Sequence, residues 1–269
     1  MAIRTAFVLT VLGMAAACSA EPVNNAAADN PDNAVTASAT TSATPQPIRL
    51  KAADGATVFG DYYPAPTPKA LILLFHQAGS SKDEYRTIAP RLVKAGYSAL
   101  AIDQRAGGSM FGKNETAAAI GHDSDFLSAR QDMQAALDWA QAKGLPIVLW
   151  GSSYSSSLIF PLAAHDPAGI KALLAFSPGE YFDDKTMIER TAAKVRLPVF
   201  ITYAKDDKAA ESIATAPKIF AVLGDRKGST LYVPEHGVHG SSTLIAAKDP
   251  KGAAANWRAV LDFLRRAVG

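Results

Sequence analysis

The chain has one cysteine, no run of basic residues, and an apolar stretch near its amino terminus that is too short to span a bilayer. With Cys18 alone, no intramolecular disulfide can form. The 27 basic and 25 acidic residues leave a formal charge of +2 and are spread along the chain, so no nucleic-acid partner is indicated. The sequence has no internal repeat. Its histidines and carboxylates do not share metal-ligand spacing on one element, so we predict no metal site and no cofactor.

The first residues have the order of a secretory signal peptide, with Arg4, an apolar stretch over 6–12 and then small residues. We predict a signal peptide over residues 1–17. The segment Ala15-Ala16-Ala17-Cys18 resembles the bacterial lipobox, in which the cysteine becomes the lipidated first residue of the mature protein. That resemblance implies export and a lipid anchor on Cys18, at the outer membrane or periplasmic face. Ordinary cleavage is the alternative and leaves a soluble periplasmic or secreted protein.

Residues 18–46 are dominated by alanine, asparagine, serine, threonine and proline and have no apolar periodicity. Such a segment cannot bury enough surface to offset its ordering entropy, so we predict a disordered tether. Residues 47–269 have globular composition and are long enough for one large α/β domain. The predicted order is therefore signal peptide, tether and a single folded domain.

The hydrophobic pattern of the folded part alternates between strands and helices. Strands over 48–52 and 57–63 flank an Asp54-Gly55 hairpin signal, which predicts an antiparallel start. Further strands are expected over 70–75, 97–102, 145–150, 170–176, 197–203 and 229–233, and helices over 83–95, 124–143, 211–223 and 256–268. This alternation predicts an α/β fold with a mostly parallel sheet and helices on both faces. No insertion is long enough for a large cap domain.

The strand over 145–150 ends at Gly151, and Ser153 follows at the head of a predicted helix. A serine in a tight strand-to-helix turn is the pattern of a nucleophile elbow, G-x-S-x-G, with Ser155 in the place of the second glycine. A serine-rich helix start is the alternative interpretation, because serine is common at helix beginnings.

A serine hydroxyl needs a base within hydrogen-bonding reach and a carboxylate that orients the base. In parallel sheets, functional residues collect just beyond the carboxyl ends of the strands. Asp206 and Asp207 follow the strand over 197–203, and His239 lies in a loop after the strand over 229–233. The sequence thus offers a serine, an acid and a histidine in that order.

Four further segments, read with the elbow, resemble motifs of the α/β-hydrolase superfamily. Residues 204–207 (A-K-D-D) are similar to its G-x-x-D loop, and residues 236–240 (H-G-V-H-G) to its G-x-H-G segment. Residues 76–79 (H-Q-A-G) resemble its H-G-x-G oxyanion segment, and residues 103–109 (D-Q-R-A-G-G-S) its D-x-R-G-x-G-x-S turn. Glycines are replaced at positions 77, 106, 155 and 204. The resemblance covers residues 47–269 and is strongest to compact dienelactone-hydrolase-type members.

The resemblance implies an exported serine hydrolase that cleaves a small-molecule ester through an acyl-enzyme. It assigns Ser153 as nucleophile, His239 as general base and then acid, and Asp207 as the orienting carboxylate. Backbone N–H groups of Ala78 and Tyr154 would form the oxyanion hole. Two alternatives stay open, a serine peptidase or amidase acting on short peptides and a catalytically silent binding lipoprotein.

Other residues compete for these roles. Asp206 remains a rival to Asp207, and His236 a rival to His239. His76 is expected to support the oxyanion loop. The acids that follow the strand over 170–176 are a further alternative for the triad acid: Glu180, Asp183 and Asp184. His122 and His165 have no partner pattern and are interpreted as surface or structural residues.

Overall fold

The computed structural model describes residues 44–207 and 211–269. The predicted signal peptide, Cys18 and the predicted tether up to residue 43 lie outside the described residues. The first strand, β1, begins at Gln46, so the folded part starts one residue before the predicted boundary at 47. Gln46 pairs with Tyr62 across the first hairpin, which places it in the sheet and not in the tether.

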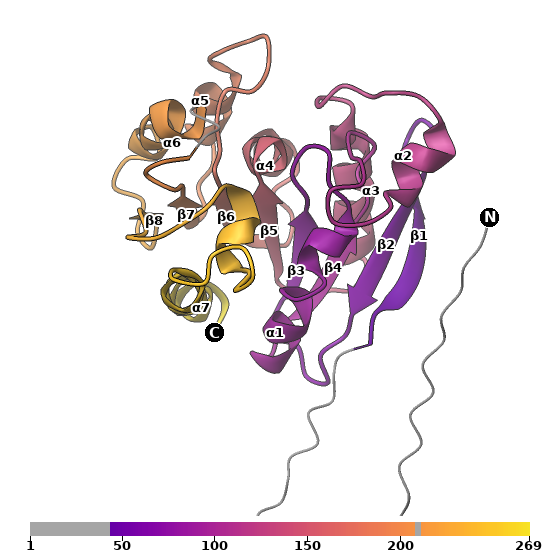
Figure 1. The fold of residues 1–269 in the computed structure, drawn as a ribbon, viewed down its shortest axis with the longest axis horizontal. Coiled ribbons are helices and arrows are strands. Elements are labelled where there is room, and N and C mark those ends of the chain that lie inside the picture. Colours follow the sequence, from indigo (N-terminus) through magenta and orange to yellow (C-terminus); the bar gives the residue numbers. More distant parts are fainter. Residues whose placement is uncertain (1–43, 208–210) are drawn as a thin grey trace, which may run out of the picture. The chain divides into compact units, whose positions relative to one another are not determined.

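One sheet forms the centre of the described structure (Figure 1). Its eight strands run in the order β1-β2-β4-β3-β5-β6-β7-β8. Only the β1–β2 and β2–β4 pairs are antiparallel, and the other pairs are parallel. The predicted mostly parallel sheet with an antiparallel start is confirmed. The strands are β1 (Gln46–Lys51), β2 (Thr57–Tyr63), β3 (Leu71–Phe75), β4 (Ser98–Ile102), β5 (Ile147–Ser152), β6 (Ile170–Phe176), β7 (Val199–Thr202) and β8 (Thr230–Tyr232).

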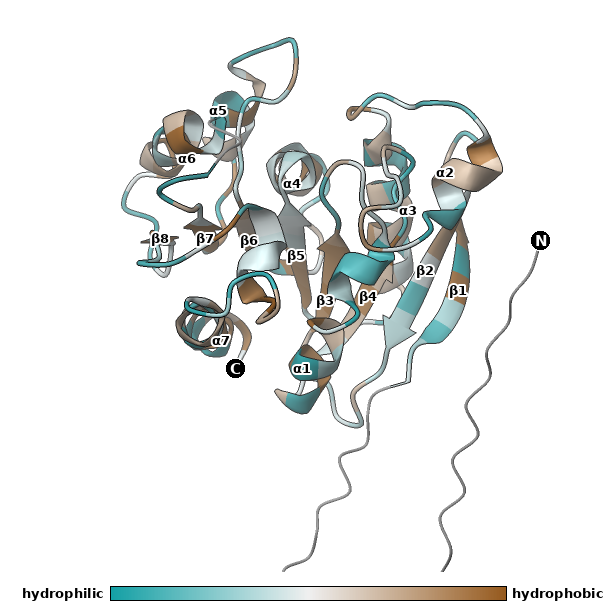
Figure 2. Ribbon diagram, in the orientation of Figure 1, coloured by the Kyte–Doolittle hydropathy of each residue, from teal (hydrophilic) through white to brown (hydrophobic). Residues whose placement is uncertain are grey.

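Helices cover both faces of the sheet, as Figure 1 shows. One apolar core lies under α3 (Ala129–Gln141), α4 (Tyr154–His165), α5 (Met187–Ala192) and α6 (Glu211–Ala221). The other lies under α1 (Ala89–Lys94) and α7 (Ala253–Val268). Leu73 of β3 points to the first core and Leu74 to the second, so the strand is buried on both faces. Figure 2 shows the result, with β3 and β4 hydrophobic along their length and edge strand β1 of mixed character.

Two helical predictions need correction, and two further helices were not predicted. The predicted helix over 83–95 is split into a short 3₁₀ helix, η1 (Lys82–Tyr85), and α1. Pro90 explains the break, because it lies in the first turn of α1, where it needs no intrahelical hydrogen bond, whereas in a longer helix it would have no N–H to donate to the Arg86 carbonyl. Helix α3 starts at Ala129 and not near 124. Two short helices were missed, α2 (Glu115–Ile120) and α5, since each has only six residues and too little periodicity to stand out.

Strands β3, β5, β6 and β7 are neighbours and run in parallel, so their carboxyl ends meet along one edge of the sheet. The segments that follow them carry the sequence motifs, beginning at His76, Ser153, Ser177 and Tyr203. The connection between β6 and β7 holds the short helix α5. The topology therefore gathers the candidate residues at one edge.

Candidate active site

Ser153 occupies a strained turn between β5 and α4. Its φ of 59° and ψ of −126° are a conformation that non-glycine residues rarely adopt. The turn is tight enough that a Cβ on Gly151 would clash with the backbone of Ser156, which explains the glycine two positions before the serine. The Ser153 N–H donates to the Phe176 carbonyl at 2.8 Å and fixes the turn to β6. An ordinary serine-rich helix start would have none of this strain.

Ser155 fills the place of the second elbow glycine without a clash. Its hydroxyl accepts a hydrogen bond from the Ser152 N–H at 2.9 Å and lies 2.8 Å from the Phe75 carbonyl, to which it donates. The side chain is fully buried and ties the elbow to the end of β3. The replacement of glycine by serine is thus accommodated by hydrogen bonds within the turn.

The structure brings His239 to Asp207. The distance from His239 Nδ1 to Asp207 Oδ2 is 2.7 Å, and the Asp207 side chain is only 1% exposed against 25% for His239. With its Nδ1 hydrogen donated to the carboxylate, the imidazole presents Nε2 as a base. Asp206 is exposed, whereas its neighbour Asp207 is buried. Of the two adjacent acids, only Asp207 lies against the histidine.

Two serines that the sequence reading missed converge on the same carboxylate oxygen. Ser177 Oγ donates to Asp207 Oδ2 at 3.2 Å, and Ser212 Oγ donates to it at 3.0 Å. Ser177 also accepts the Gly240 N–H at 3.0 Å and has a φ of 56°. Its hydroxyl therefore joins the acid to the loop that carries His239. Ser177 is 30 residues from Asp207 and 63 from Gly240, and Ser212, although only five residues from Asp207, belongs to no motif, so the folded chain is needed to reveal these contacts.

The loop after His239 packs directly on the elbow. Gly240 has a φ of 62°, and a Cβ there would clash with Ser152 Oγ. The same Cβ would lie 3.8 Å from the Ser153 nitrogen. The glycine after the histidine is required by this close approach, which places the His239 loop beside Ser153.

One predicted oxyanion donor lies on the elbow and the other on the segment after β3, whose last residue, Phe75, accepts the Ser155 hydroxyl. Tyr154 is the first residue of α4, and Ala78 lies in the segment after β3. Neither backbone N–H is used in a hydrogen bond within residues 44–207 and 211–269. Two unused N–H groups of this kind can donate hydrogen bonds to a substrate oxygen that gains negative charge.

His76 is fully buried beneath this segment. Its Nδ1 lies 2.8 Å from the Gln77 carbonyl, and its Nε2 accepts the Gln104 N–H at 2.8 Å. Both ring nitrogens are occupied, and burial lowers the pKa of the imidazole. His76 has the supporting position expected for it and no free nitrogen to act as a base.

Comparisons with known proteins agree with this architecture. A family model described as "Serine aminopeptidase, S33" matches residues 66–188. That segment includes the oxyanion segment and Ser153 but ends before Asp207 and His239. An esterase of Pyrococcus furiosus superposes with a TM-score of 0.66 at 17% identity, covering 84% of this chain and 93% of that one. The chain has the α/β-hydrolase fold.

Two more solved structures and one curated relative share this fold or part of the sequence. A cold-adapted esterase from an Arctic intertidal metagenomic library has a TM-score of 0.62 at 25% identity. The match covers 84% of this chain and 94% of the esterase. The dienelactone hydrolase of Anabaena variabilis has a TM-score of 0.64 at 16% identity, and the match covers 84% of this chain and 100% of that one. Human monoglyceride lipase is 31% identical over 144 residues, 50% of this chain. The match spans 46% of the lipase, so the chain covers about half the length of that relative.

The other acids of the α/β-hydrolase domain have structural partners. Glu180 accepts the backbone N–H groups of Ile188 and Glu189 at the start of α5, at 2.9 and 2.8 Å. Asp184 pairs with Arg190 at the surface, and Asp183 is exposed. The structure does not bring this cluster to His239.

The remaining histidines lie at the surface. His236 is exposed, and its backbone carbonyl accepts a hydrogen bond from Asn256 Nδ2 at 3.1 Å. His122 and His165 are also exposed. Among the described histidines, His239 is the one bonded to a buried carboxylate.

A cavity of about 450 Å³ borders the oxyanion segment. Its lining includes Ala78, Gly79 and Phe126 together with the polar residues His122 and Asp123. The Phe126 ring stacks on that of Tyr154 with centroids 4.5 Å apart. Arg105 also lines the cavity, but its charge is paired with Asp54 and Asp132. The cavity thus borders one proposed oxyanion donor, Ala78, and reaches the other, Tyr154, only through the stacked Phe126 ring, while no candidate triad residue lines it.

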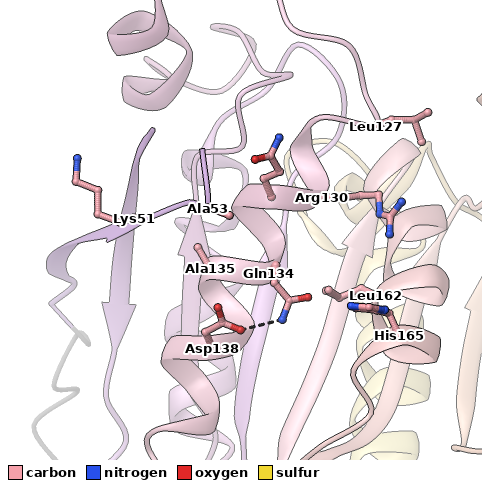
Figure 3. Close-up of a pocket in the computed structure, with 10 residues that line it drawn as sticks. Lys51, Ala53, Leu127, Arg130, Gln134, Ala135, Asp138, Leu162 and His165 are labelled. Atoms are coloured by element: carbon pink, nitrogen blue, oxygen red, sulfur yellow. Dashed lines mark hydrogen bonds between the residues drawn. The ribbon is translucent and has the colours of Figure 1, made fainter. Parts of the chain in front are cut away.

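A second cavity, of about 410 Å³, lies on the outer surface near α3 (Figure 3). Its lining includes Lys51, Arg130, Gln134, Asp138 and His165, with Gln134 Nε2 donating to Asp138 at 2.8 Å. None of the candidate triad residues lines it. It is therefore separate from the site at the carboxyl edge.

Within the ranges that the structure describes, no group of three or more histidine, cysteine, aspartate or glutamate residues could hold a metal ion. In the same ranges, no helix combines the length and the apolar character that a membrane span needs.

Proposed function

We propose that this chain is a serine hydrolase that cleaves a carboxylic ester through an acyl-enzyme on Ser153. The observation that carries the proposal is the 2.7 Å contact from His239 to the buried Asp207, in a loop that packs against the strained Ser153 turn. The esterase and lipase relatives support the same reaction class.

In the proposed reaction, His239 Nε2 takes the proton of the Ser153 hydroxyl as the oxygen adds to the ester carbonyl carbon. The same proton passes to the leaving alcohol oxygen as the C–O bond breaks. Water, activated by His239, then adds to the acyl carbon, and the acid leaves as Ser153 regains its proton. Asp207 keeps the imidazole in the Nδ1–H tautomer and stabilises the imidazolium that forms.

The backbone N–H groups of Ala78 and Tyr154 would bind the carbonyl oxygen as it gains charge. Preorganised donors of this kind are worth about 10²–10³ in rate each. The cavity beside Ala78 is lined by Phe126 and small residues on the one hand and by Arg105, His122 and Asp123 on the other, so we propose that the Phe126 ring contacts an apolar group of the ester there.

Hydrolysis of p-nitrophenyl esters of graded chain length tests the proposal. We expect turnover with an initial burst of p-nitrophenol when deacylation is the slower step, and no turnover by Ser153→Ala. A folded wild-type protein that hydrolyses none of these esters would contradict the proposed function.

A serine peptidase acting on short peptides is the second candidate, and the "Serine aminopeptidase" description of the matching family model favours it. Ester and amide cleavage use the same residues, so the substrate separates them. A p-nitroanilide of an amino acid cleaved faster than the matched p-nitrophenyl ester would favour the peptidase.

The other candidate is a catalytically silent binding lipoprotein on the same scaffold. The glycine replacements at positions 77, 106, 155 and 204 raised this alternative. Against it stand the hydrogen bonds that accommodate Ser155 in the elbow. Failure of Ser153 to react with a fluorophosphonate would favour it.

We further propose that the protein is exported and anchored to a bacterial membrane through a lipid on Cys18. The support is the sequence alone, with its charged, apolar and small-residue segments before the cysteine. The predicted tether that precedes β1 would hold the hydrolase domain away from the membrane.

A further inference from the structure

Glu84 is a glutamate buried directly beneath the candidate site, with 1% of its surface exposed. It lies in η1, and within the described residues it has no salt-bridge partner. Burial raises the pKa of the carboxyl group, while the Gln77 N–H and the Ser152 hydroxyl lower it. A carboxyl group that is buried in this way loses its hydration, and only its hydrogen bonds to the protein offset that loss. The groups that donate these bonds therefore indicate what the carboxyl group does.

The carboxyl group of Glu84 joins three segments of the site. Its Oε2 accepts the Gln77 N–H at 2.9 Å, and its Oε1 accepts the Ser152 hydroxyl at 2.7 Å. Ser152 Oγ in turn accepts the Ser241 N–H at 2.9 Å. These partners come one residue before Ala78, one before Ser153 and two after His239. One buried side chain therefore spans the proposed oxyanion donor, nucleophile and base.

The contact with Gln77 bears on the direction of the Ala78 N–H. The Gln77 carbonyl accepts the Ser80 N–H at 3.3 Å and lies 2.8 Å from His76 Nδ1. In a trans peptide the N–H points opposite to the carbonyl, so the Gln77 carbonyl fixes the direction of the Ala78 N–H. Glu84 holds the other side of Gln77 by its N–H. Together these bonds keep Gln77 in one conformation, with the Ala78 N–H left free for a substrate oxygen.

We propose that Glu84 is a positioning residue that keeps the Ala78 N–H in place relative to Ser153 and the His239 loop. The inference rests on the proposed function. It assigns no contact between Glu84 and substrate. The residue acts through Gln77 and Ser152, and its loss would misplace an oxyanion donor while substrate binding stays nearly intact.

Glu84→Leu removes both acceptors. The expected result is a fall in kcat of about 10²-fold, as for the loss of one oxyanion donor, with KM changed less than about threefold. Glu84→Gln keeps an oxygen for the Gln77 N–H, so it should recover kcat to within about tenfold of wild type. Affinity for an alkyl trifluoromethyl ketone, which forms a charged tetrahedral adduct on Ser153, should fall in parallel with kcat/KM.

Glu180→Leu is the matched control. Glu180 is equally buried and, like Glu84, accepts two hydrogen bonds, but from the backbone N–H groups of Ile188 and Glu189 at the start of α5. It should lower the melting temperature and leave kcat within about threefold, since no oxyanion donor depends on it. An equal loss of kcat in both variants, or a folded Glu84→Leu protein with unchanged kcat, would overturn the inference.

If Glu84→Leu does not fold, Ser152→Ala carries the test, because it removes one donor to Glu84 and the acceptor of the Ser241 N–H. We expect kcat to fall about tenfold with KM nearly constant, and an unchanged kcat would contradict the role. Failure of the proposed function would be seen separately, as an absence of ester turnover in the wild-type protein.

Discussion

Because the backbone at Ser153 is strained, we expect glycine at this position to give a more stable protein than alanine, the reverse of the usual order. A non-glycine residue in such a conformation costs about 1–3 kcal/mol, while glycine loses about 0.5–1 kcal/mol more than alanine through conformational entropy. Ser153→Gly should therefore be more stable than Ser153→Ala by about 0.5–2 kcal/mol in free energy of unfolding. For a domain of this size, at about 2–4 °C per kcal/mol, that difference raises the melting temperature by about 1–8 °C.

Thermal unfolding followed by circular dichroism measures the difference between the two variants, neither of which has a nucleophile. Ala163, in the interior of α4, provides the control in ordinary helical geometry. There, alanine to glycine should lower stability by about 1 kcal/mol. If Ser153→Gly is less stable than Ser153→Ala by a similar amount, the turn is not strained and the elbow interpretation loses its physical basis.

Three further predictions concern the base, the cavity and the anchor. His239→Ala should lower kcat/KM at least about 10³-fold while His236→Ala changes it little, and equal losses would mean that the base is misassigned. Phe126→Ala should shift the preferred p-nitrophenyl ester toward longer chains, and an unchanged preference would separate the cavity from substrate binding. Cys18→Ser should move the protein from the membrane to the soluble fraction, and an unchanged membrane fraction would refute the lipid anchor.

The sequence predicted the sheet well because its buried strands are continuous apolar runs. β3 and β4 are buried at every position, which leaves little ambiguity in the pattern. The helix predicted over 83–95 was wrong because the apolar residues on either side of Pro90 were read as one periodic segment. Local backbone chemistry at the proline outweighed the wider pattern.

The candidate site was predictable where a motif fixes one residue, as with Ser153 and His239. The resemblance to the G-x-x-D loop favoured Asp207 but left the adjacent Asp206 as a rival, and the fold shows that Asp207 is the one that turns inward. Ser177 and Glu84 were missed for a related reason. Each acts through contacts with segments far along the chain, and nothing in its local sequence distinguishes it from a serine or glutamate at the surface.

Labelling with a fluorophosphonate probe tests the central claim most directly, because the reaction requires an activated serine. We expect a single adduct, located on Ser153 by peptide mass spectrometry, with a rate that falls sharply in His239→Ala. A folded wild-type protein that forms no adduct, or forms it on another serine, would contradict the account.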